Sequence, residues 1–163
     1  KLKKDIFSEV IHGDSRVVDI FEQIKRENPE FYKQLKSKKI DGVFTSPPYV
    51  GQIDYHEQHA YAYELFDIPR KDKDEIGPLF KGQGQKAKDE YIEGISNVFI
   101  NISKFVKDEG DFFIVANDKY GLYPLIAEKG GLKIVEQFKR PVLNRTERDR
   151  QPYAEIIFHM RKK

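Results

Sequence analysis

Hydrophobic residues follow two different periods along the chain, and these periods predict which segments are helical and which are extended. In residues 87–106 apolar side chains recur every three or four positions, so they line one face of a helix. Residues 40–45 and 111–116 are short, continuous apolar runs, which are typical of buried strands. The chain therefore alternates strands with helices.

The remaining elements follow from shorter patterns and from turn residues. We predict strands over 6–11, 132–142 and 153–160, helices after 13–15, over 29–35, 57–66 and 122–128, and a mobile loop over about 69–88. Asp14 or Ser15 is expected to cap the first helix, and Glu109-Gly110 is expected to end the long one. The order β-α-β-α-β-α-β-β predicts one α/β domain over residues 1–163, with a terminal antiparallel strand pair.

Composition narrows the possible functions. With 163 residues, 39% of them hydrophobic, the chain can form one domain with its own core. Its 29 basic and 27 acidic residues nearly cancel, so any contact with nucleic acid must come from a local patch. The absence of cysteine excludes disulfides, thiolate metal sites and a cysteine nucleophile. No segment has the length of a membrane span or the pattern of a signal peptide, so we expect a soluble cytoplasmic protein.

The stretch Thr45-Ser46-Pro47-Pro48-Tyr49, directly after the predicted strand over 40–45, is the most informative sequence in the chain. Two consecutive prolines fix φ and lack N–H groups, which makes the loop stiff. A hydroxyl before them and an aromatic ring after them suit a flat base that carries an exocyclic amine. The alternative is an ordinary proline turn with a helix-capping serine.

This strand and loop resemble the catalytic motif of DNA amino-methyltransferases, which use S-adenosylmethionine to methylate cytosine N4 or adenine N6. Ser46, Pro47, Pro48 and Tyr49 match all four motif positions. The resemblance implies that Ser46 Oγ and the Pro47 carbonyl accept hydrogen bonds from the amine, while Tyr49 stacks on a base extruded from the duplex. It also implies a partial Rossmann-like methyltransferase sheet whose final strand inserts antiparallel.

Further residues receive roles through the same resemblance. Asp14 lies in a strand-ending acidic motif and, with Thr45, is expected to bind the cofactor. Asp54 and Tyr55 are expected to line the base pocket, although they could equally cap a helix and pack as a half-buried ring. Asn117 ends a predicted strand at the rim of the site, and is expected to contact the substrate unless it only forms a turn.

Two polar clusters leave alternatives open. Arg145, Arg148 and Arg150 could contact DNA phosphates, or could belong to a solvated hairpin in which acidic neighbours compensate the charge. His56 and His59 lack a third partner in the sequence, so we predict no metal site. We expect the loop over 69–88 to become ordered on DNA.

The family's cofactor loop, Asp-Pro-Phe-x-Gly-x-Gly, does not occur in this sequence. Gly82-Gln83-Gly84-Gln85 does not follow a predicted strand, so we interpret it as a linker. The first residue is Lys1 rather than methionine, which suggests a fragment. We therefore expect the cofactor-binding half to be a missing segment or subunit, and this chain alone to be inactive.

The leading hypothesis is a cytosine-N4 DNA methyltransferase acting on double-stranded DNA in a restriction-modification system. Serine at the first motif position favours cytosine N4 within the family. The alternatives are an adenine-N6 methyltransferase, a non-catalytic subunit of a split methyltransferase, and an RNA or protein methyltransferase. The sequence does not give the recognition site or the oligomeric state.

Overall fold

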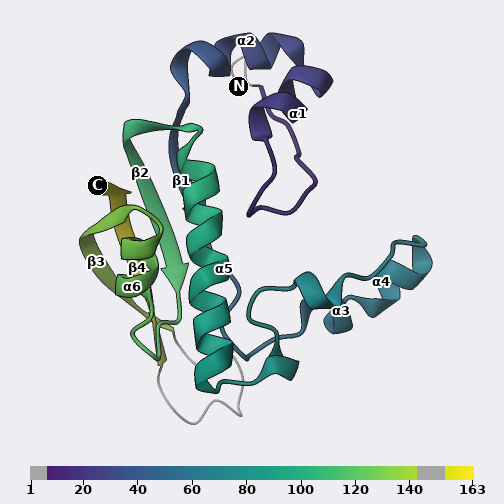
Figure 1. Ribbon diagram of the computed structural model, residues 1–163, viewed down its shortest axis with the longest axis vertical. Helices are drawn as coiled ribbons and strands as arrows, with labels where there is room; N and C mark the ends of the chain where they lie inside the picture. Colours follow the sequence, from purple (N-terminus) through teal and green to yellow (C-terminus); the bar gives the residue numbers. More distant parts are fainter. Residues whose placement is uncertain (1–6, 143–152) are drawn as a thin grey trace.

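The computed structural model describes residues 7–142 and 153–163, and Figure 1 shows its elements. In chain order they are α1 (Ile20–Glu27), α2 (Pro29–Lys38), β1 (Ile40–Thr45), α3 (Tyr55–Gln58), α4 (Ala60–Leu65), η1 (Asp72–Asp74), η2 (Leu79–Lys81), α5 (Gln85–Ser103), β2 (Val106–Ala116), α6 (Tyr123–Lys129), β3 (Leu132–Val142) and β4 (Tyr153–Lys162).

The described residues form a four-stranded mixed sheet in the order β1-β2-β4-β3. β1 runs parallel to β2, whereas β4 runs antiparallel to both of its neighbours, β2 and β3. The last strand of the chain therefore inserts between two earlier ones. The predicted α/β class with a terminal antiparallel pair is confirmed.

The hydrophobic core lies between one face of the sheet and the helices α5 and α6, which cross in front of the sheet in Figure 1. Burial alternates along β2 because successive side chains point to opposite faces, so Phe112, Ile114 and Ala116 all point towards the helices. From α5, Ile95 and Phe99 fill the same layer with 2% and 1% of their surface exposed.

The opposite face of the sheet is apolar but only partly covered in the described part of the chain. Phe113, Val115 and Ile157 are half-buried there. Phe44 of β1, which pairs with Phe113, is 78% exposed. In the described part of the chain, helices cover one face of the sheet, and the other face is only partly covered.

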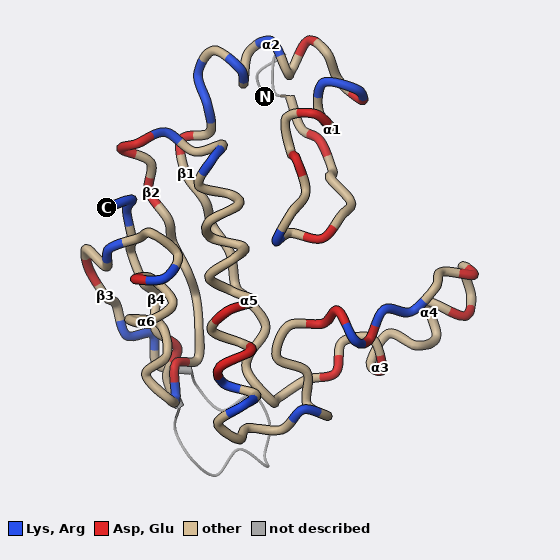
Figure 2. The backbone as a smooth tube through the Cα atoms, viewed as in Figure 1, with Lys and Arg blue, Asp and Glu red and all other residues tan. Residues whose placement is uncertain are grey.

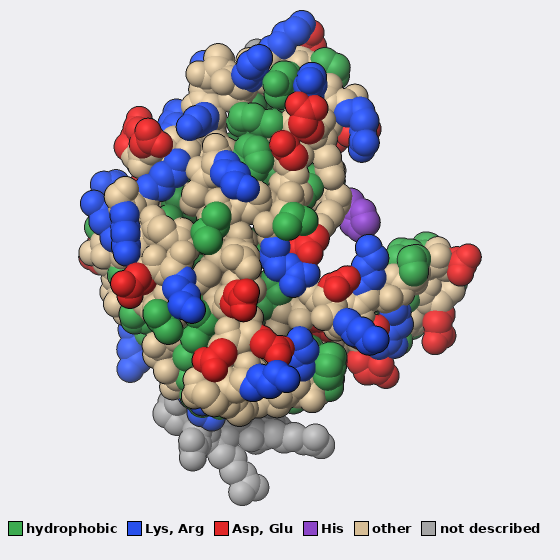
Figure 3. Space-filling view, viewed as in Figure 1, with side chains coloured by type: hydrophobic (Ala, Val, Ile, Leu, Met, Phe, Trp, Pro, Cys, Tyr) green, Lys and Arg blue, Asp and Glu red, His purple; other side chains and the backbone are tan. Residues whose placement is uncertain are grey.

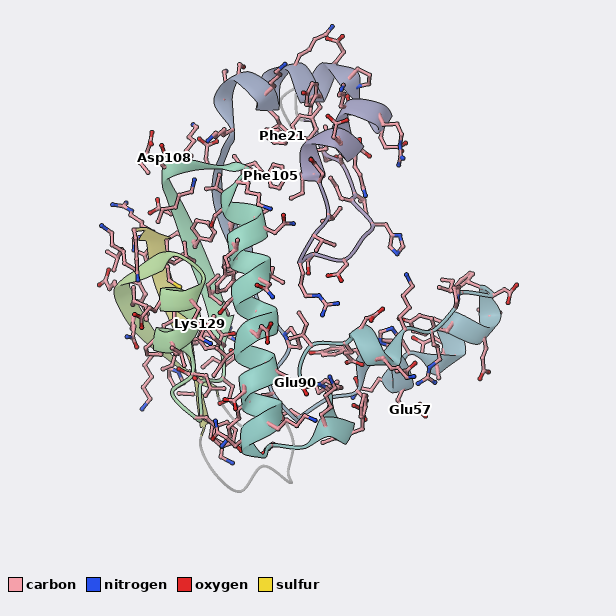
Figure 4. The ribbon with its side chains drawn as sticks, viewed as in Figure 1. Phe21, Glu57, Glu90, Phe105, Asp108 and Lys129 are labelled. Atoms are coloured by element: carbon pink, nitrogen blue, oxygen red, sulfur yellow. The ribbon has the colours of Figure 1, made fainter. Side chains whose placement is uncertain are left out.

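Helices α1 and α2 form a separate pair at one end of the sheet (Figure 1). Figure 4 shows Phe21 of α1 and Phe105 beside one another, and their ring centroids lie 4.9 Å apart. At the other end of β1, the segment that carries α3 and α4 projects away from the sheet as an arm (Figure 1).

Two predictions for the N-terminal segment were wrong. Residues 7–11 form no strand. The described sheet contains only β1, β2, β3 and β4, so these residues are not paired with any of its strands. The first helix starts at Ile20 and is capped by Asp19, whose side chain accepts from Glu22 N, rather than by Asp14 or Ser15. Asp14 is instead bonded to Arg16.

Other boundaries differ from the predicted ones. The predicted helix over 57–66 is split at His59 into α3 and α4. Helix α5 ends at Ser103, and β2 begins at Val106 rather than at 111, so Glu109-Gly110 lies within a strand instead of ending a helix. The segment 69–88 contains two 3₁₀ turns and the first turn of α5, and its mobility stays a prediction.

Replacing Ile114 with alanine tests this core. Ile114 has no exposed surface, and we expect the Ile114→Ala variant to lose about 2–5 kcal/mol of unfolding free energy, because it removes buried methyl groups and leaves a cavity. Val135→Ala is the control, since Val135 is 49% exposed and should change stability by less than about 0.5 kcal/mol. Urea unfolding of the purified chain measures both values. Equal losses of unfolding free energy in the two variants would show that Ile114 is not part of the core.

Candidate active site

The loop over 45–49 lies at the carboxyl end of β1, where ligands of open α/β sheets bind. Because β1 and β2 are parallel and Thr45 pairs with Ile114, the same edge of the sheet also carries Asn117 and Asp118, which follow β2. The structure therefore brings the predicted catalytic loop and the predicted rim residue Asn117 to one edge.

Two buried tyrosines hold the middle of the loop. The Tyr91 hydroxyl of α5 donates to the Pro48 carbonyl oxygen at 2.9 Å, and it lies 3.1 Å from the Tyr123 hydroxyl of α6. Since the one hydroxyl proton of Tyr91 goes to Pro48, Tyr123 must donate to Tyr91. The two side chains are 3% and 1% exposed, so this chain of hydrogen bonds is shielded from water.

The protonation of these tyrosines suits their role as donors. Burial, as the largest cause, raises the pKa of Tyr91 to about 12, and burial likewise raises the pKa of Tyr123 well above the usual value for a phenol. Both hydroxyls therefore keep their protons at neutral pH.

A buried carboxylate holds the end of the loop. The Tyr49 hydroxyl donates to Glu155 Oε1 of β4 at 2.8 Å. The other carboxylate oxygen, Oε2, accepts from Arg140 of β3 through Nε at 3.1 Å and also through Nη2. Glu155 is 4% exposed, although it lies in a strand of mostly apolar residues. The catalytic loop is thus bonded to the antiparallel strand pair 106 residues further along the chain.

The residues after the motif are packed against the segment before α5. The Gly51 N–H donates to the Gly77 carbonyl at 2.9 Å, and Gln83 Nε2 donates to the Gly51 carbonyl at 3.0 Å. Gly51 has a φ of +62°, and a Cβ at this position would lie 2.4 Å from the Gly82 carbonyl oxygen, so only glycine fits. The predicted linker around Gly82-Gln83 therefore contacts the loop directly.

The first half of the motif has free acceptors. Ser46 is exposed, and among residues 7–142 and 153–163 no donor bonds to Ser46 Oγ or to the Pro47 carbonyl. The Pro48 carbonyl, in contrast, is occupied by Tyr91. Within the described residues these two predicted acceptors are therefore without a donor.

A hollow of about 430 Å³ connects the loop to the N-terminal segment. Its lining includes Asp14 and Arg16 on one side, Pro48 at the base, and His56 and Glu75 from the arm. Figure 3 shows the surface indented between the N-terminal segment and the arm. The structure thus brings Asp14 and the catalytic loop to the same hollow, whereas Thr45 is not part of its lining.

Asp14 is engaged by its own neighbour. Arg16 bonds to both of its carboxylate oxygens, with the shortest contact at 2.6 Å, and this hydrogen bonding holds the pKa of Asp14 below its usual value. The carboxylate is therefore ionised at neutral pH and faces the hollow together with a cation.

Asp54 and Tyr55 lie on the arm rather than on the loop. Asp54 accepts from Phe80 N at 3.1 Å and, although it occupies the N-cap position of α3, makes no side-chain capping bond. Tyr55 is 39% exposed, and its N–H donates to Glu75 at 2.7 Å. Glu75 lines the hollow that contains Asp14, whereas Asp54 and Tyr55 are not part of its lining.

Of the other predicted site residues, one lines a second hollow and three lie outside the described residues. Asn117 lines a separate hollow of about 460 Å³ with Asp118 and Lys139. Arg145, Arg148 and Arg150 lie outside the described residues. The described surface carries both signs of charge on most of its elements, without a face of one sign in the view of Figure 2.

His56 takes part in a hydrogen-bonded contact rather than a metal cluster. Its Nδ1 lies 3.2 Å from Glu75 Oε2, and its ring stacks on Tyr63 with centroids 5.1 Å apart. Over the described ranges no group of three or more histidine and carboxylate side chains could hold a metal ion. In the same ranges no helix combines the length and the apolar character that a membrane crossing needs.

Sequence reasoning did not predict that the loop is held by four other residues, Tyr91, Tyr123, Arg140 and Glu155. The helical period of residues 87–106 places Tyr91 on the apolar face of α5, but this period does not give a partner for its hydroxyl. Glu155 carried one usable signal, since an acidic residue within an apolar strand needs a buried partner.

No protein-family model matches the sequence. The chain is 63% identical over 161 residues to the type II methyltransferase M.MjaII of Methanocaldococcus jannaschii. The match covers 99% of this chain but only 30% of that protein, so the chain spans less than a third of its relative. The predicted resemblance to a methyltransferase is confirmed at this level.

Two solved structures are also similar to the chain. A crystal structure of the M1.HpyAVI–SAM complex matches 93% of this chain and 53% of its own, with 17% identity and a TM-score of 0.40. A crystal structure of M1.HpyAVI matches 93% and 55%, with 16% identity and a TM-score of 0.38.

Replacing Tyr91 with phenylalanine tests the hydrogen bonds of the loop. The Tyr91→Phe variant loses the donor to Pro48 and leaves the Tyr123 hydroxyl without its acceptor, so we expect it to lose about 1–3 kcal/mol of unfolding free energy. Tyr61→Phe is the matched control, because Tyr61 is 68% exposed and its substitution should change stability by less than about 0.5 kcal/mol. Thermal unfolding compares the two, and equal stabilities would contradict the assigned role.

The raised pKa of Tyr91 predicts alkaline sensitivity. The folded chain holds this proton more tightly than the unfolded chain, so the stabilisation is complete below about pH 10 and is lost as the pH rises through about 12. We expect the melting temperature of the native chain to fall more steeply between these pH values than that of Tyr91→Phe. Parallel pH profiles would show that Tyr91 is not buried in its neutral form.

Proposed function

We propose that this chain is the base-holding part of a DNA amino-methyltransferase that transfers a methyl group from S-adenosylmethionine to cytosine N4. The observation that carries the proposal is the loop over 45–49. It presents Ser46 Oγ and the Pro47 carbonyl as free acceptors, while Pro48 and Tyr49 are fixed from behind by Tyr91 and Glu155.

The chemistry needs two acceptors close together. The lone pair of an aryl amine is delocalised into its ring, which makes the nitrogen a poor nucleophile. When Ser46 Oγ and the Pro47 carbonyl accept from the two N–H groups, the nitrogen moves towards tetrahedral geometry and its lone pair becomes available. We propose that the fixed loop holds both acceptors in place, so that this stabilisation requires little rearrangement during the reaction.

Tyr49 supplies the stacking surface for the base. An exocyclic amine inside a duplex is not accessible, so the base must leave the stack at a cost of a few kcal/mol. Stacking on an aromatic ring contributes about 1–3 kcal/mol per base and offsets part of that cost. We propose that Asp54, Tyr55 and Asn117 line the base pocket and that Arg145, Arg148 and Arg150 contact DNA phosphates.

The hollow that joins Asp14 to Pro48 fits part of the cofactor. It offers an ionised carboxylate, which can accept hydrogen bonds, beside the catalytic loop. We propose that Asp14 holds the cofactor there and that Thr45, which lies at the end of β1 and outside the lining of this hollow, also contacts the cofactor. When bound, S-adenosylmethionine supplies a methyl group on a positively charged sulfur, and the amine attacks that methyl directly, without a covalent enzyme intermediate.

The remainder of the cofactor site is proposed to come from a segment or subunit outside this chain. The sequence lacks the glycine-rich cofactor loop, and the chain spans only 30% of its methyltransferase relative. Within the described residues, β1 pairs with a strand on one side only, and Phe44 of β1 is 78% exposed. These features suit a sheet that continues past β1 and a further layer that covers the open face.

Adenine N6 is the alternative target, because its amine presents the same two N–H groups to the same acceptors. Serine at position 46 favours cytosine N4 through the family resemblance. The alternative that is not an enzyme is a non-catalytic subunit of a split methyltransferase. A restriction-modification context is proposed because the relative is described as a type II methyltransferase.

The test uses the complete enzyme that contains this chain, methyl-labelled S-adenosylmethionine and duplex DNA, followed by mass spectrometry of the nucleosides. We expect N4-methylcytosine; N6-methyladenine would overturn the choice of base. If the enzyme labels RNA or a peptide and leaves duplex DNA unlabelled, the assignment of DNA as the substrate would be wrong.

The Ser46→Ala variant tests the first acceptor. We expect the rate of methyl transfer to fall by roughly 10²-fold, by analogy with the loss of one oriented hydrogen bond in other active sites. Ser37→Ala in α2 is the matched control, because Ser37 bonds only within its own helix, to the Gln34 carbonyl, and its loss should leave the rate unchanged. Equal rates for the two variants would show that Ser46 is not an acceptor for the amine.

A further inference from the structure

We propose that Glu155 is a positioning residue that fixes the ring of Tyr49 for stacking on the target base, and that Arg140 in turn holds Glu155. This inference rests on the proposed function. It assigns a role to a carboxylate that neither the motif nor the relative's name mentions.

The burial of Glu155 calls for an explanation. Its side chain is 5% exposed, and an isolated carboxylate in such a place is strongly unfavourable unless it is paired and hydrogen-bonded. Both of its oxygens are engaged, Oε1 by the Tyr49 hydroxyl and Oε2 by Arg140. Glu155 and Arg140 are also directly opposite one another in the β3–β4 ladder, so the ion pair is built into the strand register.

Arg140 connects this buried group to the surface. Its side chain is 54% exposed, whereas the carboxylate it contacts is nearly inaccessible. Because the carboxylate oxygens are taken up by two donors, Glu155 is badly placed to act as a proton acceptor for a substrate. Its hydrogen bond with the Tyr49 hydroxyl suits a residue that orients the Tyr49 ring rather than one that transfers a proton.

The hydrogen bond restricts the ring in a specific way. The backbone fixes the Cβ end of Tyr49 and Glu155 fixes the hydroxyl end, so the long axis of the ring is held at both ends. Only rotation about this axis remains. A ring held in this way loses less conformational entropy when a base stacks on it than a free tyrosine would.

The experiment uses the complete enzyme with three variants, Tyr49→Phe, Glu155→Gln and the double variant. Tyr49→Phe keeps the ring and removes the hydroxyl. In Glu155→Gln the side chain keeps its size, but its amide cannot accept from Tyr49 and Arg140 together. Two readouts are taken: the single-turnover rate of methyl transfer, and the fluorescence of 2-aminopurine placed at the target base, which reports stacking.

We expect each single variant to lower the transfer rate roughly tenfold, as one hydrogen bond to a charged group would, and to raise the fluorescence of the unstacked probe. The double variant should be no slower than the slower single variant, because both changes remove the same contact. Losses that multiply in the double variant, or an unchanged rate in Glu155→Gln, would overturn the proposal.

Asp111→Asn is the matched control. Asp111 also accepts from an arginine across the sheet, Arg161 at 2.7 Å, but it lies in the middle of β2, opposite Gly42 of β1 and away from the edge that carries the loop. Its substitution should leave the rate and the fluorescence unchanged. If Glu155→Gln does not fold, Arg140→Met replaces it, since Arg140 is half-exposed and its loss should weaken the hold on Glu155 in the same direction.

The side-chain mobility of Tyr49, measured by NMR as its χ1 rotamer populations, separates the failure of this proposal from the failure of the proposed function. A native enzyme that methylates nothing would reject the proposed function. The Tyr49 side chain should still populate more χ1 rotamers in Glu155→Gln than in the native protein, because the hydroxyl end of the ring is released. Equal rotamer populations would reject the role of Glu155, whatever the enzyme methylates.

Discussion

The Ser46–Tyr49 loop cannot hold itself in place, and this constraint organises the rest of the site. Pro47 and Pro48 have no N–H groups, so the loop lacks the donors with which other turns bond to themselves. Its conformation depends on groups supplied from outside, namely the Tyr91 hydroxyl on Pro48 and the Glu155 carboxylate on Tyr49.

These groups come from elements that are far apart in sequence. Tyr91 belongs to α5, Tyr123 to α6 and Glu155 to β4, and all three are at most 4% exposed. Tyr91 and Tyr123 belong to the core between the sheet and its helices, whereas Glu155 shares the opposite face of the sheet with Ile157, so the loop is fixed from both faces. Along the described residues no donor bonds to Ser46 Oγ or to the Pro47 carbonyl, whereas the holding groups bond to Pro48 and Tyr49.

Much of the fold could be predicted from the sequence because its signals are local. The period of α5, the apolar run of β1 and the order of the last two strands all gave the right elements. The strand predicted at 6–11 failed because alternation does not supply a partner strand. The contacts of Tyr91 and Glu155 with the loop span 43 and 106 residues, so local pattern does not identify these partners, even though the acidic residue in an apolar strand indicates that Glu155 has one.

The proposed function also limits what this chain does by itself. The hollow beside Asp14 is proposed to hold one part of the cofactor, the sequence lacks the glycine-rich loop, and one face of the described sheet is only partly covered. The central claim is that this chain holds the base and that most of the cofactor site comes from elsewhere. Calorimetric titration of S-adenosylmethionine tests it most directly. The account predicts tight binding by the complete enzyme and none by this chain alone, whereas tight binding by the isolated chain would contradict it.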